Sequence, residues 1–459
     1  MNEPANTILS NIRESIDALS GFMWGPWMLV LLVGTHVFLT IRLRGIQRFV
    51  PRGIRLSLQR SREGDGEISH YGALVTALAA TVGTGNIVGV STAIVGGGPG
   101  AVFWMWITGV LGIATKYGEA LLSVKYRVVD AEGRVSGGPM YVLERGLGLR
   151  WLGMLFALFT AVAAFGIGNM TQANSISNML KLHDVSPAVS GLVMAILVAI
   201  VIIGGIRSIA RVCELLVPLM AIVYATGCLV LLVMHVERLP DTIRLIFESA
   251  FSGHAVAGGF AGATIKEAMR YGVARGLFSN ESGLGSAPIV AAAAQTRTAV
   301  RQALVSATGT FWDTVVICLM TGLVVVNSGE WTTHGLDGAH LTNAAFNFGV
   351  PVPGFGRLGT AILTIGMLTF VFSTILGWSY YGEKACEYLL GSRAIFPYRL
   401  LWVGAVMLGS VAELNTVWAF SDIANALMAL PNLLSLLLLS GVIVQETREH
   451  LWNTDGTNL

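Results

Sequence analysis

The sequence is short of charge, of cysteine and of catalytic motifs, and each shortage excludes a class of protein. Only 12% of the 459 residues are charged, whereas soluble domains carry roughly 25%, so a fully water-facing surface is excluded. The formal net charge of +2 is too small to predict a nucleic-acid partner. The 4 cysteines show no CxxC spacing, which predicts neither a disulfide framework nor a metal cluster. Because HExxH and GxSxG motifs are also absent, we expect no enzyme.

Apolar residues make up 54% of the chain, in runs that exceed the roughly 20 residues needed to cross a bilayer. They predict an all-α membrane protein with about eleven spans, preceded by an amphipathic segment at 1–21 and followed by a tail at 445–459. In the seventh span, residues 264–278 include four charged side chains; an extracellular amphipathic helix with a short re-entrant piece is the alternative. The expected spans are 22–41, 72–97, 99–123, 151–176, 187–205, 213–235, 256–294, 303–327, 358–380, 397–413 and 417–444.

Lysine and arginine are concentrated in every second loop between these spans. Seven arginines lie between Arg42 and Arg62, whereas residues 327–356 contain neither lysine nor arginine. Positively charged loops stay in the cytoplasm. The pattern therefore places the N-terminus outside and the C-terminus, with Arg448, in the cytoplasm.

Two of the expected spans are interrupted by glycine. Residues 79–89 of the second span contain Gly83-Thr84-Gly85-Asn86, and residues 278–288 of the seventh contain Gly283-Leu284-Gly285 beside Glu281. Glycine weakens a helix and frees backbone groups for other partners. Close packing of small residues is the alternative for the first segment, and a buried structural network around Glu281 is the alternative for the second.

The positions of the two breaks are more informative than either motif. They lie five spans apart, and a repeat with an odd number of spans must be inverted in its second copy. Paired breaks of this kind mark the binding site of inverted-repeat transporters. We therefore expect repeats at 72–235 and 256–444, with 22–41 as one extra helix.

The helix ends at such breaks have opposite polarity. The half-helix after each break begins with unpaired N–H groups, which suit a carboxylate. The half-helix before each break ends with free carbonyls, which suit an ammonium group or a sodium ion. Together the four ends predict a site for a zwitterionic amino acid and a cation.

Three segments resemble the alanine or glycine:cation symporter (sodium:alanine symporter) family. They are Ala80–Asn86, Gly97–Trp106 and Gly276–Glu281, and the likeness extends over essentially the whole chain. The resemblance implies the LeuT-type five-plus-five fold within the amino acid-polyamine-organocation superfamily. It also implies a multi-pass protein of the bacterial plasma (inner) membrane, functional as a monomer.

The resemblance also implies a set of site residues. The substrate carboxylate would meet Thr84, Gly85 and Asn86, and Trp378 would limit the size of the side chain. Interhelical hydrogen bonding by Gln172, backbone bonding by Ser373 and Thr374, and simple packing by Trp378 are the alternatives. The implied substrate contacts are Thr84, Gly85, Asn86, Gln172, Phe278, Ser279, Asn280, Glu281, Thr374 and Trp378, and the implied sodium ligands are the carbonyls of Ala79 and Val82 with the hydroxyls of Ser373 and Thr374.

The function implied is sodium-coupled import of alanine or glycine by alternating access, with sodium as the co-transported ion. A proton-coupled permease of the same fold, using Glu281, is the alternative; a channel would need charged rings or filter loops from several subunits.

Lys116 and Glu119 are spaced to pair on one helix. Asp313 and Glu214 are further acids within spans, without an assigned role.

Overall fold

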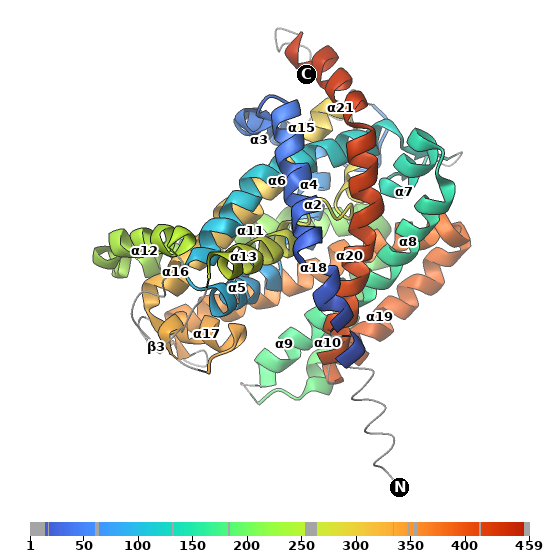
Figure 1. Cartoon of the computed structure of the whole chain (residues 1–459). Coiled ribbons are helices and arrows are strands. Elements are labelled where there is room, and N and C mark those ends of the chain that lie inside the picture. The colour runs from blue at the N-terminus through green and yellow to red at the C-terminus, as the bar shows by residue number, and fades with distance from the viewer. Residues whose placement is uncertain are drawn as a thin grey trace.

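The computed structural model is built almost entirely of helices (Figure 1). It describes residues 14–16, 18–59, 64–130, 133–181, 184–252, 264–333, 335–347, 349, 351–352, 356–412 and 415–453. Seven described helices are long and apolar enough to cross a membrane, and a bent pair makes an eighth span. Most of the amphipathic segment expected at 1–21 lies outside the described residues. The total of about eleven spans stays a prediction.

The helices of the first half surround the first break. A serine hydroxyl starts α4, because Ser69 Oγ accepts the N–H of Gly72. The bent pair consists of α4 and the segment Gly85–Gly97, which meet at 56°. The helices are α2 (Pro26–Arg42), η1 (Ile46–Phe49), α3 (Val50–Ser57), α4 (His70–Thr81), η2 (Gly85–Gly89), α5 (Val90–Gly97), α6 (Gly100–Lys125), α7 (Pro139–Tyr141), η3 (Val142–Gly146), α8 (Arg150–Phe165), η4 (Gly166–Met170), α9 (Thr171–Lys181), α10 (Pro187–Ile202) and α11 (Gly205–Met234).

The second half contains the second break, between α13 and α14. A capping box of Thr264 and Glu267 starts α13. The seventh expected span therefore appears as two helices, and its residues 256–263 lie outside the described part. The helices are η5 (Val236–Arg238), α12 (Leu239–Phe251), α13 (Ile265–Asn280), α14 (Pro288–Ala291), α15 (Ala299–Thr310), η6 (Phe311–Cys318), α16 (Leu319–Ser328), η7 (Glu330–Thr332), α17 (Gly338–Ala345), α18 (Leu358–Leu390), η8 (Ser392–Ala394), α19 (Ile395–Val411), α20 (Asn415–Leu438), α21 (Ser440–Thr447) and η9 (Arg448–Trp452).

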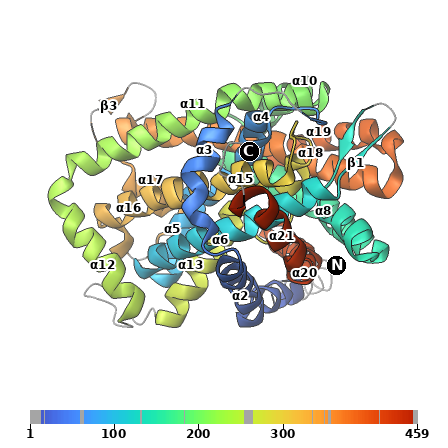
Figure 2. The ribbon, with the colours of Figure 1, turned by 90° about the horizontal axis from the view of Figure 1, so that it is seen from above.

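Segments far apart in the sequence form the centre of the molecule. Helix α6 packs against α13 and α15, while α18 packs against α8, α11 and α4. Figure 2 shows α10 and α11 along one edge and α2 and α20 along the opposite one, with α6 and α15 between them. Two small hairpins interrupt the helical pattern, β1 (Val128–Val129) with β2 (Val135–Ser136) and β3 (Pro351–Val352) with β4 (Gly356–Arg357). The arrangement brings both breaks into the interior.

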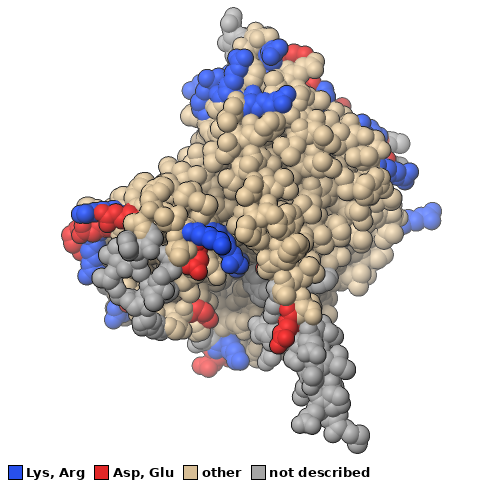
Figure 3. Space-filling model, viewed as in Figure 1, with Lys and Arg blue, Asp and Glu red and all other residues tan. Residues whose placement is uncertain are grey.

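The outer surface fits a bilayer. On α10, Leu192, Ile196 and Ile200 recur every four residues and are 52–68% exposed, a stripe that a soluble protein would bury. The chain is therefore a multi-pass membrane protein. Lysine and arginine gather at the end of the molecule that carries α3 and α21 (Figure 3); Arg42 and Arg55 are exposed there.

Some boundaries differ from those expected. Helix α18 continues ten residues past the expected end at 380 to Leu390, and α11 begins at Gly205 instead of 213. Helix α12, which no expected span covers, lies beside α6 and α16. Its polar residues at 241, 244 and 248 lower its mean hydropathy, so the sequence did not predict a membrane span there. Helix α13 is mostly exposed at its charged start, whereas from Gly272 onward it is buried or half-buried, and it packs against α5 and α6.

Candidate functional site

The helices that flank the two breaks touch each other in the interior. The first break consists of residues 82–84, between α4 and η2, and the second of residues 281–287, between α13 and α14. A Cβ added to Gly85 would lie 3.3 Å from the Cα of Ser279 and 3.3 Å from Cδ1 of Phe278. Such a distance is tighter than ordinary van der Waals contact, so glycine allows this approach. Residues implied for the substrate carboxylate thus lie against residues implied for its amine.

Asn86 reorganises the backbone of the first break. Its Oδ1 accepts the N–H of Gly83 at 2.8 Å, and its own N–H donates to the Gly83 carbonyl at 3.2 Å. In a continuous helix these two N–H groups would donate to the carbonyls of Ala79 and Val82. The break therefore removes the helical donors of the two carbonyls that the resemblance implies for sodium.

A hydroxyl from α18 lies opposite these carbonyls. Thr374 Oγ1 is 3.4 Å from the Val82 carbonyl oxygen and also donates to the Phe370 carbonyl at 2.9 Å. Gly377 allows this approach, because a Cβ there would lie 2.8 Å from the Ala80 nitrogen. The Ser373 hydroxyl donates to the Phe370 carbonyl at 2.8 Å and lies 3.5 Å from Met220 Sδ. Thr374 thus lies at the break, whereas the Ser373 hydroxyl contacts its own helix and Met220 of α11.

Gln172 has an unused acceptor beside the first break. Its Nε2 lies 3.3 Å from Thr84 Oγ1 and donates to the Ile167 carbonyl at 2.9 Å. Its Oε1 is buried without a hydrogen-bond partner in the described part of the chain. A buried amide oxygen of this kind is costly unless a ligand or water donates to it, so it suits a substrate ammonium group.

The side chains of the second break mostly serve the break itself. Asn280 Oδ1 accepts the N–H of Ser282 at 2.9 Å, and its Nδ2 donates to Thr314 Oγ1 at 3.0 Å. The Ser286 hydroxyl donates to the Glu281 carboxylate, which also interacts with the buried Trp378. The structure therefore contains a buried network around Glu281, the alternative that the sequence left open.

Asp313, to which the sequence assigned no role, connects the two breaks. Its Oδ1 accepts from Asn86 Nδ2 at 2.7 Å, and its Oδ2 accepts from the hydroxyls of Ser279 at 2.9 Å and Thr314 at 2.7 Å. Asp313 is fully buried in η6. One carboxylate thus fixes the first break relative to the helix that precedes the second.

Glu119 holds the second break from α6. Its Oε1 accepts the N–H groups of Gly283 at 3.0 Å and Gly285 at 3.1 Å, together with Asn432 Nδ2 at 2.7 Å. Both glycines have positive φ, +95° and +84°, a backbone form that other residues rarely adopt. The expected pairing with Lys116 is not a direct contact: Lys116 Nζ has no hydrogen-bond partner in the described part, although its charge interacts with that of Glu119. Lys116 and Glu119 do lie three residues apart on one helix, but the Glu119 carboxylate accepts instead from Gly283, Gly285 and Asn432.

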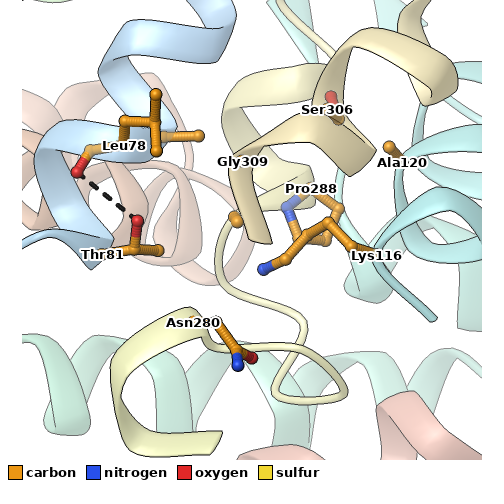
Figure 4. A pocket seen from close by; sticks show the side chains of 10 residues that line it. Leu78, Thr81, Lys116, Ala120, Asn280, Pro288, Ser306 and Gly309 are labelled. Atoms are coloured by element: carbon orange, nitrogen blue, oxygen red, sulfur yellow. Dashed lines mark hydrogen bonds between the residues drawn. The ribbon is translucent and has the colours of Figure 1, made fainter. Parts of the chain in front are cut away.

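A small cavity of about 10 Å³ lies beside the breaks (Figure 4). That volume holds about a single water molecule, so the cavity cannot contain an amino acid. Lys116 points toward it, and Asn280, Thr81 from α4 and Ser306 from α15 lie on its walls.

Comparison with known proteins decides the family. A sequence profile of the "Sodium:alanine symporter family" matches residues 9–457. The chain belongs to this family. It is 50% identical over 442 residues to an uncharacterized transporter of Haemophilus influenzae, covering 96% of each chain. It is 50% identical over 444 residues to the sodium/alanine symporter AgcS of Methanococcus maripaludis, covering 94% of this chain and 96% of the relative.

A solved structure carries the same fold. The crystal structure of MhsT in complex with L-phenylalanine superposes with a TM-score of 0.56 at 14% identity, covering 86% of this chain and 94% of MhsT. Identity at this level shows the fold alone. The chain is therefore a transporter of the LeuT-type fold, and the sodium:alanine symporter family contains transporters and not enzymes.

Proposed function

We propose that this transporter imports a small neutral amino acid, alanine or glycine, together with sodium. The observation that carries the proposal is the first break. There the carbonyls of Ala79 and Val82 lose the N–H donors of a continuous helix, because the Gly83 N–H donates to Asn86 Oδ1 and the Asn86 N–H donates to the Gly83 carbonyl. The Thr374 hydroxyl lies 3.4 Å from the Val82 carbonyl. Carbonyl and hydroxyl oxygens are the ligands that hard cations prefer. AgcS, a relative with 50% identity, is named a sodium/alanine symporter, which supports sodium as the cation and alanine as a substrate here.

The amino acid would lie where the two breaks meet. Its carboxylate would bind the backbone and hydroxyl of Thr84-Gly85-Asn86, at the start of η2, where the helix end favours negative charge. Its ammonium group would donate to Gln172 Oε1, the buried acceptor without a partner in the described chain. Phe278 and Trp378 would border the side chain, which favours a small one.

Import would follow from the orientation and the membrane potential. The exposed arginines beside α3 support a cytoplasmic position for that end and for the C-terminus, with the N-terminus outside. A zwitterion carries no net charge, so each sodium ion moves one positive charge inward. An inside-negative potential supplies roughly 2.3 kcal/mol per charge per 100 mV.

Uptake into proteoliposomes tests the proposal. We expect labelled alanine and glycine to accumulate in sodium buffer and not in choline buffer at the same pH. Thr84→Val should lower the sodium-dependent rate, because it removes the hydroxyl that lies 3.3 Å from Gln172 Nε2. Equal uptake in the two buffers would refute sodium coupling and favour a proton-coupled permease.

A further inference from the structure

Lys116 is a buried amine in the middle of α6. The residue is 4% exposed, and its Nζ has no hydrogen-bond partner in the described part of the chain. The side chain points into the small cavity of Figure 4. A buried ammonium group without hydrogen bonds is costly unless nearby negative charge compensates for it. The surroundings of Lys116 should therefore contain that charge.

Three buried carboxylates supply it. Glu119, Glu281 and Asp313 each interact electrostatically with Lys116, and they come from α6, the second break and η6. His36 of α2, which is hydrogen-bonded to Thr115, faces Lys116 as well.

The hydrogen bonds to these carboxylates come from uncharged groups. Glu119 accepts from backbone and amide N–H groups, Asp313 from an amide and two hydroxyls, and Glu281 from a hydroxyl. Such donors stabilise a carboxylate but do not neutralise its charge. Lys116 is a positive charge that acts on all three.

Resting on the sodium coupling proposed above, we propose that Lys116 is a built-in cation that replaces one transported ion and so sets the number of sodium ions carried per amino acid. The cavity has room for one water-sized species, and Thr81 and Ser306 carry hydroxyl oxygens on its walls. If the Lys116 ammonium group were removed, these oxygens and the nearby carboxylates would bind a free cation in the cavity. When the ammonium group is present, its own charge takes the place of that cation.

The sodium-to-alanine flux ratio of proteoliposomes tests this role. Wild type would be compared with Lys116→Met, which removes the charge, and Lys116→Arg, which keeps it. Lys125→Met is the matched control, because Lys125 lies on the same helix in an exposed pair with Glu446. We expect Lys116→Met to raise the ratio by about one sodium ion per alanine, and the other two variants to keep the wild-type ratio. Transport by Lys116→Met at the wild-type ratio would overturn the proposal.

Two further measurements cover an inactive or unfolded variant. If Lys116→Met folds but does not transport, sodium titration of alanine binding to the purified protein should be steeper than for wild type; an unchanged slope would overturn the proposal. If it does not fold, the double variant Lys116→Met/Glu119→Gln removes one charge of each sign and should restore both folding and the wild-type ratio. A double variant that stays unfolded would also overturn it. A wild type without sodium-dependent uptake would refute the proposed function instead.

Discussion

The two helix breaks solve the same structural problem in different ways. The first covers only residues 82–84, and a side chain from its own segment, Asn86, redirects its N–H groups. The second covers residues 281–287, and side chains from other helices hold it, because Glu119 of α6 accepts two of its N–H groups. The first break therefore leaves carbonyls available, whereas the second has much of its backbone already bonded.

This difference suggests a different role for each break: ligand binding for the first and structural support for the second. Carbonyls without helical donors are stable inside a membrane protein only where they line a cavity or bind a ligand, and the sodium site proposed above uses those of the first break. A backbone fixed by a buried carboxylate is rigid, and a rigid wall keeps a ligand site in its productive geometry. We infer that the ions and the substrate bind mainly through the first break, and that the second break shapes the site.

Removing the link between the breaks should have the largest effect. Asp313→Ala removes the buried carboxylate that accepts from Asn86, Ser279 and Thr314. We expect this to cost roughly 3–5 kcal/mol and to lower alanine uptake at least roughly 100-fold. Uptake is measured per folded protein in proteoliposomes. Glu248→Ala, on the exposed pair with Arg244, is the control and should transport normally. Wild-type uptake by Asp313→Ala would show that the breaks are independent.

Releasing the second break should affect stability more than sodium affinity. Glu119→Ala removes the acceptor for Gly283 and Gly285, and we expect a loss of roughly 3 kcal/mol, seen as a lower Tm of the purified protein. Glu446→Ala, which breaks the exposed pair with Lys125, should cost under about 1 kcal/mol. An unchanged Tm for Glu119→Ala, or a large change in the sodium dependence of its residual uptake, would contradict the supporting role of this break.

The sequence predicted where the helices break but not what holds the breaks. Gly83-Thr84-Gly85 and Gly283-Leu284-Gly285 are local signals, and both positions are interrupted in the structure. Asp313 lies 227 residues from Asn86 in the chain, and Asn432 lies 313 from Glu119. No local pattern indicates which buried acid meets which break, because that depends on how distant helices pack. The sequence did show that Asp313 is an acidic residue within an apolar span. It did not show that Asp313 would bind Asn86, Ser279 and Thr314.

Within the first break, Thr374 and Ser373 should differ in importance. Thr374→Val removes the hydroxyl beside the Val82 carbonyl, and we expect the half-saturating sodium concentration to rise roughly tenfold, equal to about 1.4 kcal/mol. Ser373→Ala should raise it by roughly threefold or less, since that hydroxyl donates to the Phe370 carbonyl of its own helix. Sodium titration of alanine uptake measures both. Equal shifts for the two variants would place both hydroxyls in contact with the ion.

The smallest effect should appear in substrate choice, at the wall that the second break supports. Trp378 is 1% exposed, packs edge-on against Tyr381 at 5.4 Å and contacts the Glu281 carboxylate. Trp378→Leu shortens this wall, so we expect alanine uptake to fall only about threefold while valine or leucine begins to compete, since an added methylene in an apolar pocket changes selectivity by about 10–200-fold. Competition against labelled alanine measures the change. If larger amino acids still fail to compete, Trp378 supports Glu281 and packs the core, and the size limit comes from the first break instead.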